Sequence, residues 1–572
     1  MDLIQVKINN KNIEVEPGTT ILDAAKKLNI HIPTLCYLKL HDKKTINSPA
    51  SCRICVVEVV GRKNLAPACC TLVSPNMIIK TNSPKVISSR KTILELIISN
   101  HCNDCLTCAK NQKCELQSLA SEYGINSISF KGSKSPINKE NTNYSIVRDT
   151  SKCILCRRCE SICTNIQGIS AIGPINRGFD TILSTAFFQD LNSSNCSLCG
   201  QCVAVCPTGA LMEKDNTNEV FNVIQDPNKF VVVQTAPSVR AALGEEFGIL
   251  EESVTGKMIS ALRELGFDKV YDSNFAADLT IVEEAKEFLS RYTKNINLPM
   301  FTSCCPGWIN FIEKHYGNLT PLLSTCKSPQ QMWGAIAKTY LAEKLGISKD
   351  NLVVVSVMPC LAKKYEAKRP ELNNDVDIVI STRELAKMIK TAGIPFNYLQ
   401  DDSFDKLMGE STGASSIFGT SGGVMEAALR TSYEWISNKS LENIDFESVR
   451  GLDGVKEASV EINGNIINVA VVNGLKNAKH LLDNIEVTSK KYHFIEVMAC
   501  PGGCINGGGQ PYSNNNYQLI EKRKNLLYLE DANKSIRKSH ENPEVINLYS
   551  EFLKDSNNEK AHNLLHTYYK IK

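Results

Sequence analysis

Cysteines are the residues of this chain best suited to chemistry. The sequence contains 23 of them among 572 residues, and many lie two or three residues apart. In a reducing compartment such crowded thiols are more often metal ligands than disulfide partners, because thiolate is a soft ligand and disulfides are rare there. We therefore interpret the cysteine spacing as a series of metal sites.

The clearest pattern is a run of four cysteines that occurs twice, with two, two and three residues between successive cysteines. The runs are Cys153, Cys156, Cys159 and Cys163, and then Cys196, Cys199, Cys202 and Cys206. Bacterial ferredoxins with two [4Fe-4S] clusters have this spacing, and the fourth thiolate of each run binds the other cluster. The prediction is that Cys206 completes the first cluster and Cys163 the second. Structural zinc is the weaker alternative, since paired cysteines also bind zinc.

Two further ligand groups lie nearer the N-terminus. The first has a lone cysteine, a close pair and a distant fourth, namely Cys36, Cys52, Cys55 and Cys69. Its layout resembles plant-type [2Fe-2S] ferredoxins, with spacing closer to the electron-input module of respiratory complex I. Cys70 is an alternative to Cys69, which we prefer because it follows the Pro67, Ala68 lead of that family.

The second group is His101, Cys105, Cys108 and Cys114. A lone histidine is usually a surface or core residue, but here a neutral imidazole would supply the fourth ligand that the three cysteines lack. The group resembles the His-ligated [4Fe-4S] site of complex I.

The elements that position these groups differ along the chain. Alternating apolar residues over 4–8 and 13–15, with a turn over 9–12, predict a hairpin, and a helix capped by Thr20 follows. Residues 81–126 are helix-like. Residues 131–151 are polar and lack an apolar period, which predicts a linker.

From Lys229 onward short apolar runs alternate with amphipathic helices, which is typical of an α/β domain. Residues 231–233, 353–357 and 494–497 predict buried parallel strands. Each is followed by a loop that contains Pro or Gly, and in open parallel sheets the reactive site lies beyond the carboxyl ends of the strands. Chemistry should therefore converge on these loops.

Four more cysteines lie at predicted strand ends: Cys305 in the segment Thr302–Pro306, Cys360 in Met358–Cys360, and Cys500 with Cys504 in Met498–Cys504. The three segments, in this order, resemble the signature motifs of iron-only (FeFe) hydrogenases. The resemblance covers essentially the whole chain and has the module order of the monomeric clostridial enzymes.

The resemblance implies an H-cluster, in which a [4Fe-4S] cubane shares one thiolate with a two-iron unit bearing carbon monoxide, cyanide and an azadithiolate. By motif position Cys305, Cys360, Cys500 and Cys504 would hold the cubane, with Cys504 as the bridge. Lys363 matches the family's cyanide-binding lysine. The rest of the pocket lining would be Ala236, Pro237, Ser238, Gln330, Met358 and Met498. Core packing is the alternative for the two methionines, and glycines at 422, 423 and 507–509 would let the backbone approach the cofactor.

A buried redox site also needs a proton route, because a bare charge in a dry interior is costly. Cys304 matches the family's terminal proton donor, and the rest of the relay would be Glu284, Ser324, Glu287 and Arg291. Without the resemblance, a solvated helix face would be the ordinary interpretation of the two glutamates. Cys326 follows the relay serine, and we hypothesise that it modulates redox behaviour or oxygen damage.

The implied fold is multidomain α/β and α+β. It has a β-grasp, plant-type [2Fe-2S] domain at 1–80, a helical His/Cys3 [4Fe-4S] domain at 81–130, a bacterial 2[4Fe-4S] ferredoxin-like domain at 131–215 and a two-lobed catalytic domain at 216–572. The implied cofactors are one [2Fe-2S] cluster, three accessory [4Fe-4S] clusters and the H-cluster.

The net charge of +3 gives no reason to expect nucleic acid or a membrane as partner. No long apolar run or secretory signal occurs, so a cytoplasmic protein is expected. Residues 1–130 carry 16 Lys and Arg against 10 Asp and Glu, an excess of six positive charges that would steer an acidic carrier such as ferredoxin. The resemblance implies protons and hydrogen as substrates, ferredoxin as electron carrier, dedicated maturation enzymes and a monomer.

Two alternatives remain. A complex I electron-input subunit shares the first two modules but lacks the motifs after residue 300. A hydrogen-sensing or iron-sulfur assembly relative without turnover is the other, although assembly relatives lack the full set of motifs present here.

Overall fold

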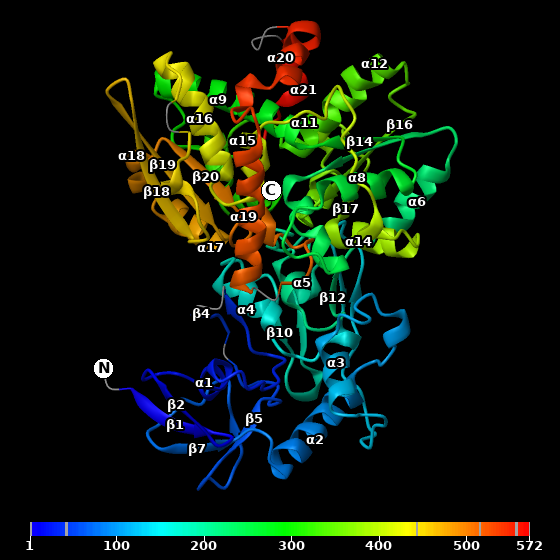
Figure 1. Cartoon of the computed structure of the whole chain (residues 1–572), viewed down its shortest axis with the longest axis vertical. Helices are drawn as coiled ribbons and strands as arrows, with labels where there is room; N and C mark the ends of the chain where they lie inside the picture. The colour runs from blue at the N-terminus through cyan, green and yellow to red at the C-terminus, as the bar shows by residue number, and fades with distance from the viewer. Residues whose placement is uncertain are drawn as a thin grey trace.

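The computed structural model describes residues 3–40, 44–47, 49–441, 444–513, 516–554 and 559–570. In Figure 1 the chain rises from an N-terminal sheet at the bottom, through a cysteine-rich middle, to a large α/β part at the top. None of the helices in these ranges combines the length and apolar character that a bilayer crossing requires.

The N-terminal part is a five-stranded sheet in the order β2-β1-β7-β5-β6. The predicted hairpin is confirmed, since β1 (Ile4–Ile8) pairs antiparallel with β2 (Lys11–Val15). Its turn is shorter than predicted, because Asn9 and Asn10 adopt positive φ and the strand resumes at Lys11. The remaining strands are β5 (Val56–Val59), β6 (Ala66–Pro67) and β7 (Met77–Lys80). The helix α1 (Ile21–Lys27) begins as predicted, with the Thr20 side chain accepting a hydrogen bond from the Asp23 amide.

Two helices follow, α2 (Pro84–Asn100) and α3 (Glu115–Glu122), as the helix-like pattern predicts. Leu94 and Ile98 of α2 pack with Leu116 and Leu119 of α3 and with Leu35 of the N-terminal part. The loop between the helices, which carries the second ligand group, is thereby held against the first module.

The predicted linker over 131–151 is wrong for its second half. Residues 131–138 have no regular structure, but β8 (Lys139–Glu140) and β9 (Ile146–Asp149) form a three-stranded sheet with β12 (Leu211–Glu213). The partner strand of β9 is some 60 residues away in the sequence, so local polarity could not reveal the pairing. This sheet lies beside α4 (Arg158–Asn165) and α5 (Gln201–Val205), which contact each other and carry parts of the two cysteine runs.

The large part contains two four-stranded sheets. The first, β14-β13-β16-β17, is parallel throughout: β13 (Phe230–Thr235), β14 (Lys269–Asp272), β16 (Leu352–Met358) and β17 (Ile378–Ser381). The second, β15-β20-β19-β18, is parallel except for the hairpin of β18 (Val455–Ile462) and β19 (Asn465–Asn473); its other strands are β15 (Met300–Phe301) and β20 (Phe494–Met498). The three predicted strands are confirmed as β13, β16 and β20.

The helix α9 (Asn274–Lys294) joins the two sheets. Its residues Phe275 and Leu279 pack into the core of the first sheet, whereas Ile281 and Phe288 pack into the core of the second. Most of the helix is therefore buried, and the polar side chains of α9 are held at the junction of the two lobes.

Further helices cover this part. They are α14 (Thr382–Thr391), which has the expected Ser381/Glu384 capping box, α16 (Gly423–Ser437), α19 (Tyr517–Asn533), α20 (Pro543–Leu548) and α21 (Glu559–Leu565). In Figure 1 α20 and α21 lie at the top of the molecule, and their apolar residues join the core of the first sheet.

Candidate active site

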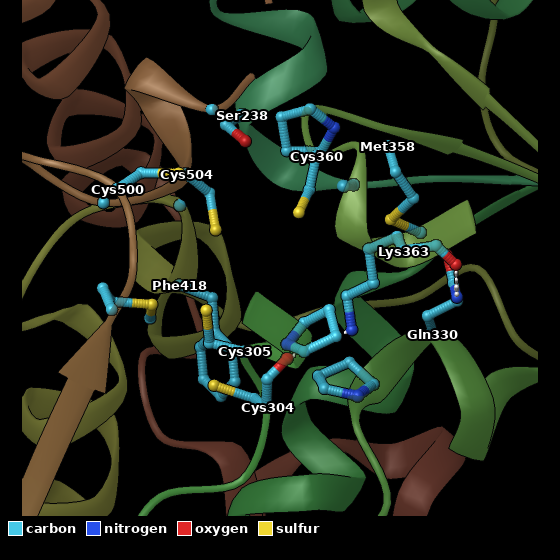
Figure 2. A pocket seen from close by; sticks show the side chains of 18 of the residues that line it. Ser238, Cys304, Cys305, Gln330, Met358, Cys360, Lys363, Phe418, Cys500 and Cys504 are labelled. Carbon is cyan, nitrogen blue, oxygen red and sulfur yellow. Dashed lines mark hydrogen bonds between the residues drawn. The ribbon is translucent and has the colours of Figure 1, made fainter. Parts of the chain in front are cut away.

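The carboxyl ends of strands from both sheets face one cavity with about 850 Å³ of empty volume. The first sheet contributes the loops after β13 and β16, and the second contributes the loops after β15 and β20. Figure 2 shows side chains from all four loops around a common central space. The lining residues discussed below are Ala236, Pro237, Ser238, Cys304, Cys305, Gln330, Met358, Cys360, Lys363, Met498, Cys500 and Cys504.

Four thiols that lie far apart in the sequence meet here. Cys305 precedes α10 (Pro306–His315), Cys360 follows β16, and Cys500 and Cys504 follow β20. Burial raises the pKa of Cys504, and the nearby Cys305 and Cys360 raise it further. Protons on crowded, dry thiols are costly to remove unless a metal takes their place, so this donor set fits an iron-sulfur cluster.

Polar atoms without partners face the same space. Ser238 Oγ and Gln330 Oε1 are buried and make no hydrogen bond among the described residues. An unpaired buried polar atom costs about 1–3 kcal/mol, so a polar ligand is expected beside them. Lys363 Nζ donates to Cys304 O at 3.1 Å and to Glu366 Oε2 at 2.9 Å. Despite burial, Glu366 raises the pKa of Lys363, which keeps a positive charge at the pocket for an anionic ligand.

Two glycines let the loops close around the cavity. Gly503 has φ of +95°, and a Cβ there would lie 2.6 Å from Ser421 N; at Gly507 it would lie 2.2 Å from Pro359 O. Of the five glycines predicted to approach a cofactor, Gly507 lines the cavity, whereas the others do not and instead approach neighbouring protein atoms: Gly422, Gly423, Gly508 and Gly509. Their small size serves loop packing, which corrects the prediction.

A line of polar groups leads away from Cys304. Glu284 of α9 is fully buried, and neither of its oxygens has a hydrogen-bond partner among the described residues. Ser324 Oγ donates to Glu287 Oε2 at 2.9 Å, and Arg291 Nη2 donates to Glu287 Oε1 at 2.6 Å. The side chain of Glu287 retains 13% exposure, so the line ends near solvent. The alternative of a solvated helix face is wrong for Glu284.

Burial sets the protonation of the inner groups. It raises the pKa of Glu284 to about 8, with a further contribution from the charge of Glu287. Burial and the nearby Glu284 also raise the pKa of Cys304. Both groups therefore hold a proton at neutral pH, the form in which each can donate.

The two cysteine runs come together in crossed order. Cys153, Cys156, Cys159 and Cys206 line one cavity. Cys163 of the first run lies close enough to Cys196, Cys199 and Cys202 of the second to raise their pKa values, although burial is the larger cause. Cys199 also lines the large cavity, which puts this second group next to Cys500. The sequence contained no indication of that contact.

The four thiols of the first N-terminal ligand group also lie close together in pairs. Cys55 Sγ lies 3.3 Å from Cys69 Sγ, and the Cys36 and Cys52 thiols interact with each other. Cys70, in contrast, is exposed.

In the second group, Cys108 lies close enough to Cys105 and Cys114 to raise the pKa of both thiols, although burial is the larger cause. The Nδ1 atom of His101 accepts a hydrogen bond from the Asn103 amide, while its buried Nε2 has no partner among the described residues. That free ring nitrogen fits a metal ligand.

Five protein families match successive parts of the chain. They are a 2Fe-2S iron-sulfur cluster binding domain at 2–84, the NADH-ubiquinone oxidoreductase-G iron-sulfur binding region at 90–129, a 4Fe-4S dicluster domain at 152–210, the C-terminal domain of the iron only hydrogenase large subunit at 229–508 and the iron hydrogenase small subunit at 517–572.

Relatives match over the full length. The NADP-reducing hydrogenase subunit HndD of Solidesulfovibrio fructosivorans is 53% identical over 100% of this chain and 99% of its own. Iron hydrogenase 1 of Clostridium pasteurianum is 43% identical over 98% of this chain and 99% of its own. A solved structure of the apo [FeFe]-hydrogenase HydA1 from Chlamydomonas reinhardtii, 40% identical, matches 62% of this chain and 99% of that chain with a TM-score of 0.56. With thiols, unpaired polar atoms and a buried acid gathered in one cavity and these relatives spanning the sequence, the chain belongs to the iron-only (FeFe) hydrogenases.

Proposed function

We propose that the cavity interconverts two protons and two electrons with molecular hydrogen, and that ferredoxin exchanges the electrons through accessory iron-sulfur clusters. The observation that carries this proposal is the meeting of four thiols, unpaired polar atoms and a protonated buried acid in one cavity. A site that only stored electrons would not need the last two features.

In this proposal Cys305, Cys360, Cys500 and Cys504 would hold the [4Fe-4S] part of the H-cluster, and Cys504 would be the thiolate that it shares with the two-iron part. Lys363 and Ser238 would offer a positive charge and a hydroxyl donor to the polar ligands of that unit, and Gln330 Oε1 would accept a hydrogen bond from a donor group in it. Ala236, Pro237, Met358 and Met498 contribute apolar surface that excludes water. When bound, the H-cluster supplies the two-electron chemistry with hydrogen that no side chain can perform.

Side chains of the protein bind and transfer the proton. Cys304 holds it at the cavity wall, and its neighbour Glu284 is the next carrier. Ser324 can accept a proton from Glu284 while its hydroxyl donates to Glu287. Arg291 positions the Glu287 carboxylate near solvent.

The accessory groups form the electron route. Cys36, Cys52, Cys55 and Cys69 hold a [2Fe-2S] cluster, and His101 with Cys105, Cys108 and Cys114 holds a [4Fe-4S] cluster. The crossed cysteine runs hold two more. Since Cys199 lines the active cavity, the second of these clusters would lie next to that cavity and would supply its electrons.

We further propose a cytoplasmic monomer built from the four domains 1–80, 81–130, 131–215 and 216–572, loaded by maturation enzymes. The name of the Solidesulfovibrio relative supports a second candidate, in which the chain is the hydrogen-handling subunit of an NADP-reducing assembly. The two candidates differ in partner and not in the chemistry of the cavity.

Hydrogen evolution by matured protein tests the function. The proposal expects turnover with reduced viologen and with reduced ferredoxin. The second candidate expects turnover with viologen but with NADPH only after other subunits are added. Absence of hydrogen evolution from viologen with a fully loaded cofactor would contradict both and favour a sensor or assembly role.

A further inference from the structure

Cys326 is a buried thiol that the proposed reaction does not use. Its backbone pairs with His566, near the C-terminus, in an antiparallel bridge. Two backbone hydrogen bonds of 2.8 Å flank the bridge: the Lys327 amide donates to Leu565 O, and the Thr567 amide donates to Thr325 O. Residues directly opposite in such a pair place their side chains on the same face, so thiol and imidazole project together.

Glu287 of α9 completes a three-residue cluster. One ligand atom each from Cys326, His566 and Glu287 lies within 4.8 Å of the other two, and Cys326 Sγ is 3.8 Å from Glu287 Oε2. Zinc binds Cys, His and Glu atoms at about 2.0–2.3 Å, which puts tetrahedral ligands roughly 3.5 Å apart. Side-chain rotations that bring the atoms together by about 1 Å or less would meet this geometry.

His566 already has the surroundings of a metal-binding histidine. Its Nε2 lies 3.0 Å from Glu283 Oε2, and its Nδ1 lies 2.8 Å from the hydroxyl of Thr325. A carboxylate that accepts from one ring nitrogen fixes the tautomer and leaves the other nitrogen to the metal. Rotation of the Thr325 hydroxyl would release Nδ1 for this purpose.

The carboxylates around the cluster favour a cation. Glu287 and Glu283 both lie close to Cys326, whereas Glu284, which is also close, is protonated at neutral pH and adds no charge. The nearby cations are Arg291, which pairs with Glu287, and Lys286, which lies 3.2 Å from Glu283. A thiol combined with imidazole and carboxylate suits zinc, whereas magnesium and calcium prefer oxygen alone.

We propose that Cys326, His566 and Glu287 bind a divalent cation of the zinc class and that this cation closes the outer end of the proton relay. Glu287 is the acceptor for the Ser324 hydroxyl, and a cation on its carboxylate would keep it from taking up a proton. The binding depends on the three residues alone. The inhibition rests on the proposed function, in which Glu287 belongs to the relay.

The test uses the loaded, full-length enzyme and zinc chloride. After equilibrium dialysis, wild type should hold one more zinc ion per chain than Cys326→Ala. His566→Gln serves as a second variant in case Cys326→Ala does not fold. Hydrogen evolution from reduced viologen, compared with and without zinc, should fall at least about tenfold in wild type and recover with a chelator. Both variants should resist this inhibition, whereas Cys70→Ala, which removes an exposed thiol elsewhere, should behave as wild type.

Anomalous scattering at the zinc edge from soaked crystals locates the ion independently of activity. An ion on the three residues without any loss of hydrogen evolution would support the site and contradict the relay. Equal zinc content and equal inhibition in wild type, Cys326→Ala and His566→Gln would overturn the site.

Discussion

The N-terminal thiol site and the large cavity use the same kind of ligand in different surroundings. In both, four cysteines from three separate segments meet. Among residues 3–40, 46–47 and 49–80, however, no buried side-chain nitrogen or oxygen lacks a hydrogen bond, whereas the cavity has Ser238 and Gln330 unpaired and Glu284 close by. A site that passes electrons needs ligands alone. A site that makes and breaks bonds to hydrogen also needs unpaired polar atoms and protonated side chains.

The largest effect should come from a thiol of the cavity. Cys504→Ala removes the proposed bridge, so hydrogen evolution from viologen should fall by at least about a thousandfold, because the reaction depends wholly on the bound cofactor. Iron content should fall as well. If Cys504→Ala kept nearly the wild-type rate of hydrogen evolution, the cavity would not be the site of the reaction, and the proposed difference between it and the N-terminal site would be wrong.

Cys304→Ala should be next in size. General acid catalysis contributes about a hundredfold to ten-thousandfold, so evolution should drop within that range while the iron content stays constant. Cys326→Ala is the matched control, since this thiol is also buried but lies outside the relay; it should stay within a few-fold of wild type. Equal losses in the two variants would show that packing, and not proton donation, is responsible.

Glu284 should control the pH profile. With a pKa of about 8, it is protonated below that value, so hydrogen evolution should decline as the pH rises above about 8. Glu284→Gln should lose about a hundredfold in rate. It should also remove that limb of the profile. An unchanged alkaline limb in Glu284→Gln would assign the titration to another group.

The same carboxyl group affects stability. The folded protein keeps the proton of Glu284 between its ordinary pKa of 4.5 and about 8, while the unfolded chain has released it. Stability should therefore decrease as the pH rises across this window and level off above it. Thermal unfolding of Glu284→Gln should be less pH-dependent there than that of wild type.

Variants of Cys69 and Cys70 test which of these two thiols is the fourth ligand of the N-terminal site. Cys69→Ser should lose the electron paramagnetic resonance signal of a reduced [2Fe-2S] cluster and several-fold of ferredoxin-driven turnover, but little of the viologen-driven turnover. Cys70→Ser should keep all three, because this thiol is exposed and lies outside the buried group. The reverse result would make Cys70 the ligand.

The smallest effect concerns the approach of the carrier. The excess of six positive charges in residues 1–130 should steer an acidic ferredoxin, so kcat/KM with ferredoxin should fall by roughly twofold as salt rises. Turnover with viologen serves as the control and should not follow salt. A salt-independent ferredoxin reaction would remove charge steering from the account.

The sequence predicted the parts of the fold that have a local cause. The valine-rich runs of β13 and β16 are mostly apolar because parallel strands are covered on both faces, and the loops after them carry the cavity residues. The strand β9 was missed because its partner β12 is distant in the sequence. The burial of Glu284 was not visible either, since α9 packs between two cores and every residue from Asn274 to Ala285 is buried, polar ones included.

Contacts between modules could not be predicted from local sequence patterns either. Cys199 belongs to a ferredoxin-type run by spacing, yet it touches the cavity through the docking of one module on another. The pairing of Cys326 with His566 joins segments 240 residues apart, and only the fold shows it.

Infrared spectroscopy of the matured protein tests the central claim most directly. Wild type should show bands of metal-bound carbon monoxide and cyanide, and Cys504→Ala should lack them while its N-terminal clusters stay intact. Protein that evolves hydrogen without such bands, or a Cys504→Ala variant that retains them, would contradict the assignment of the cavity.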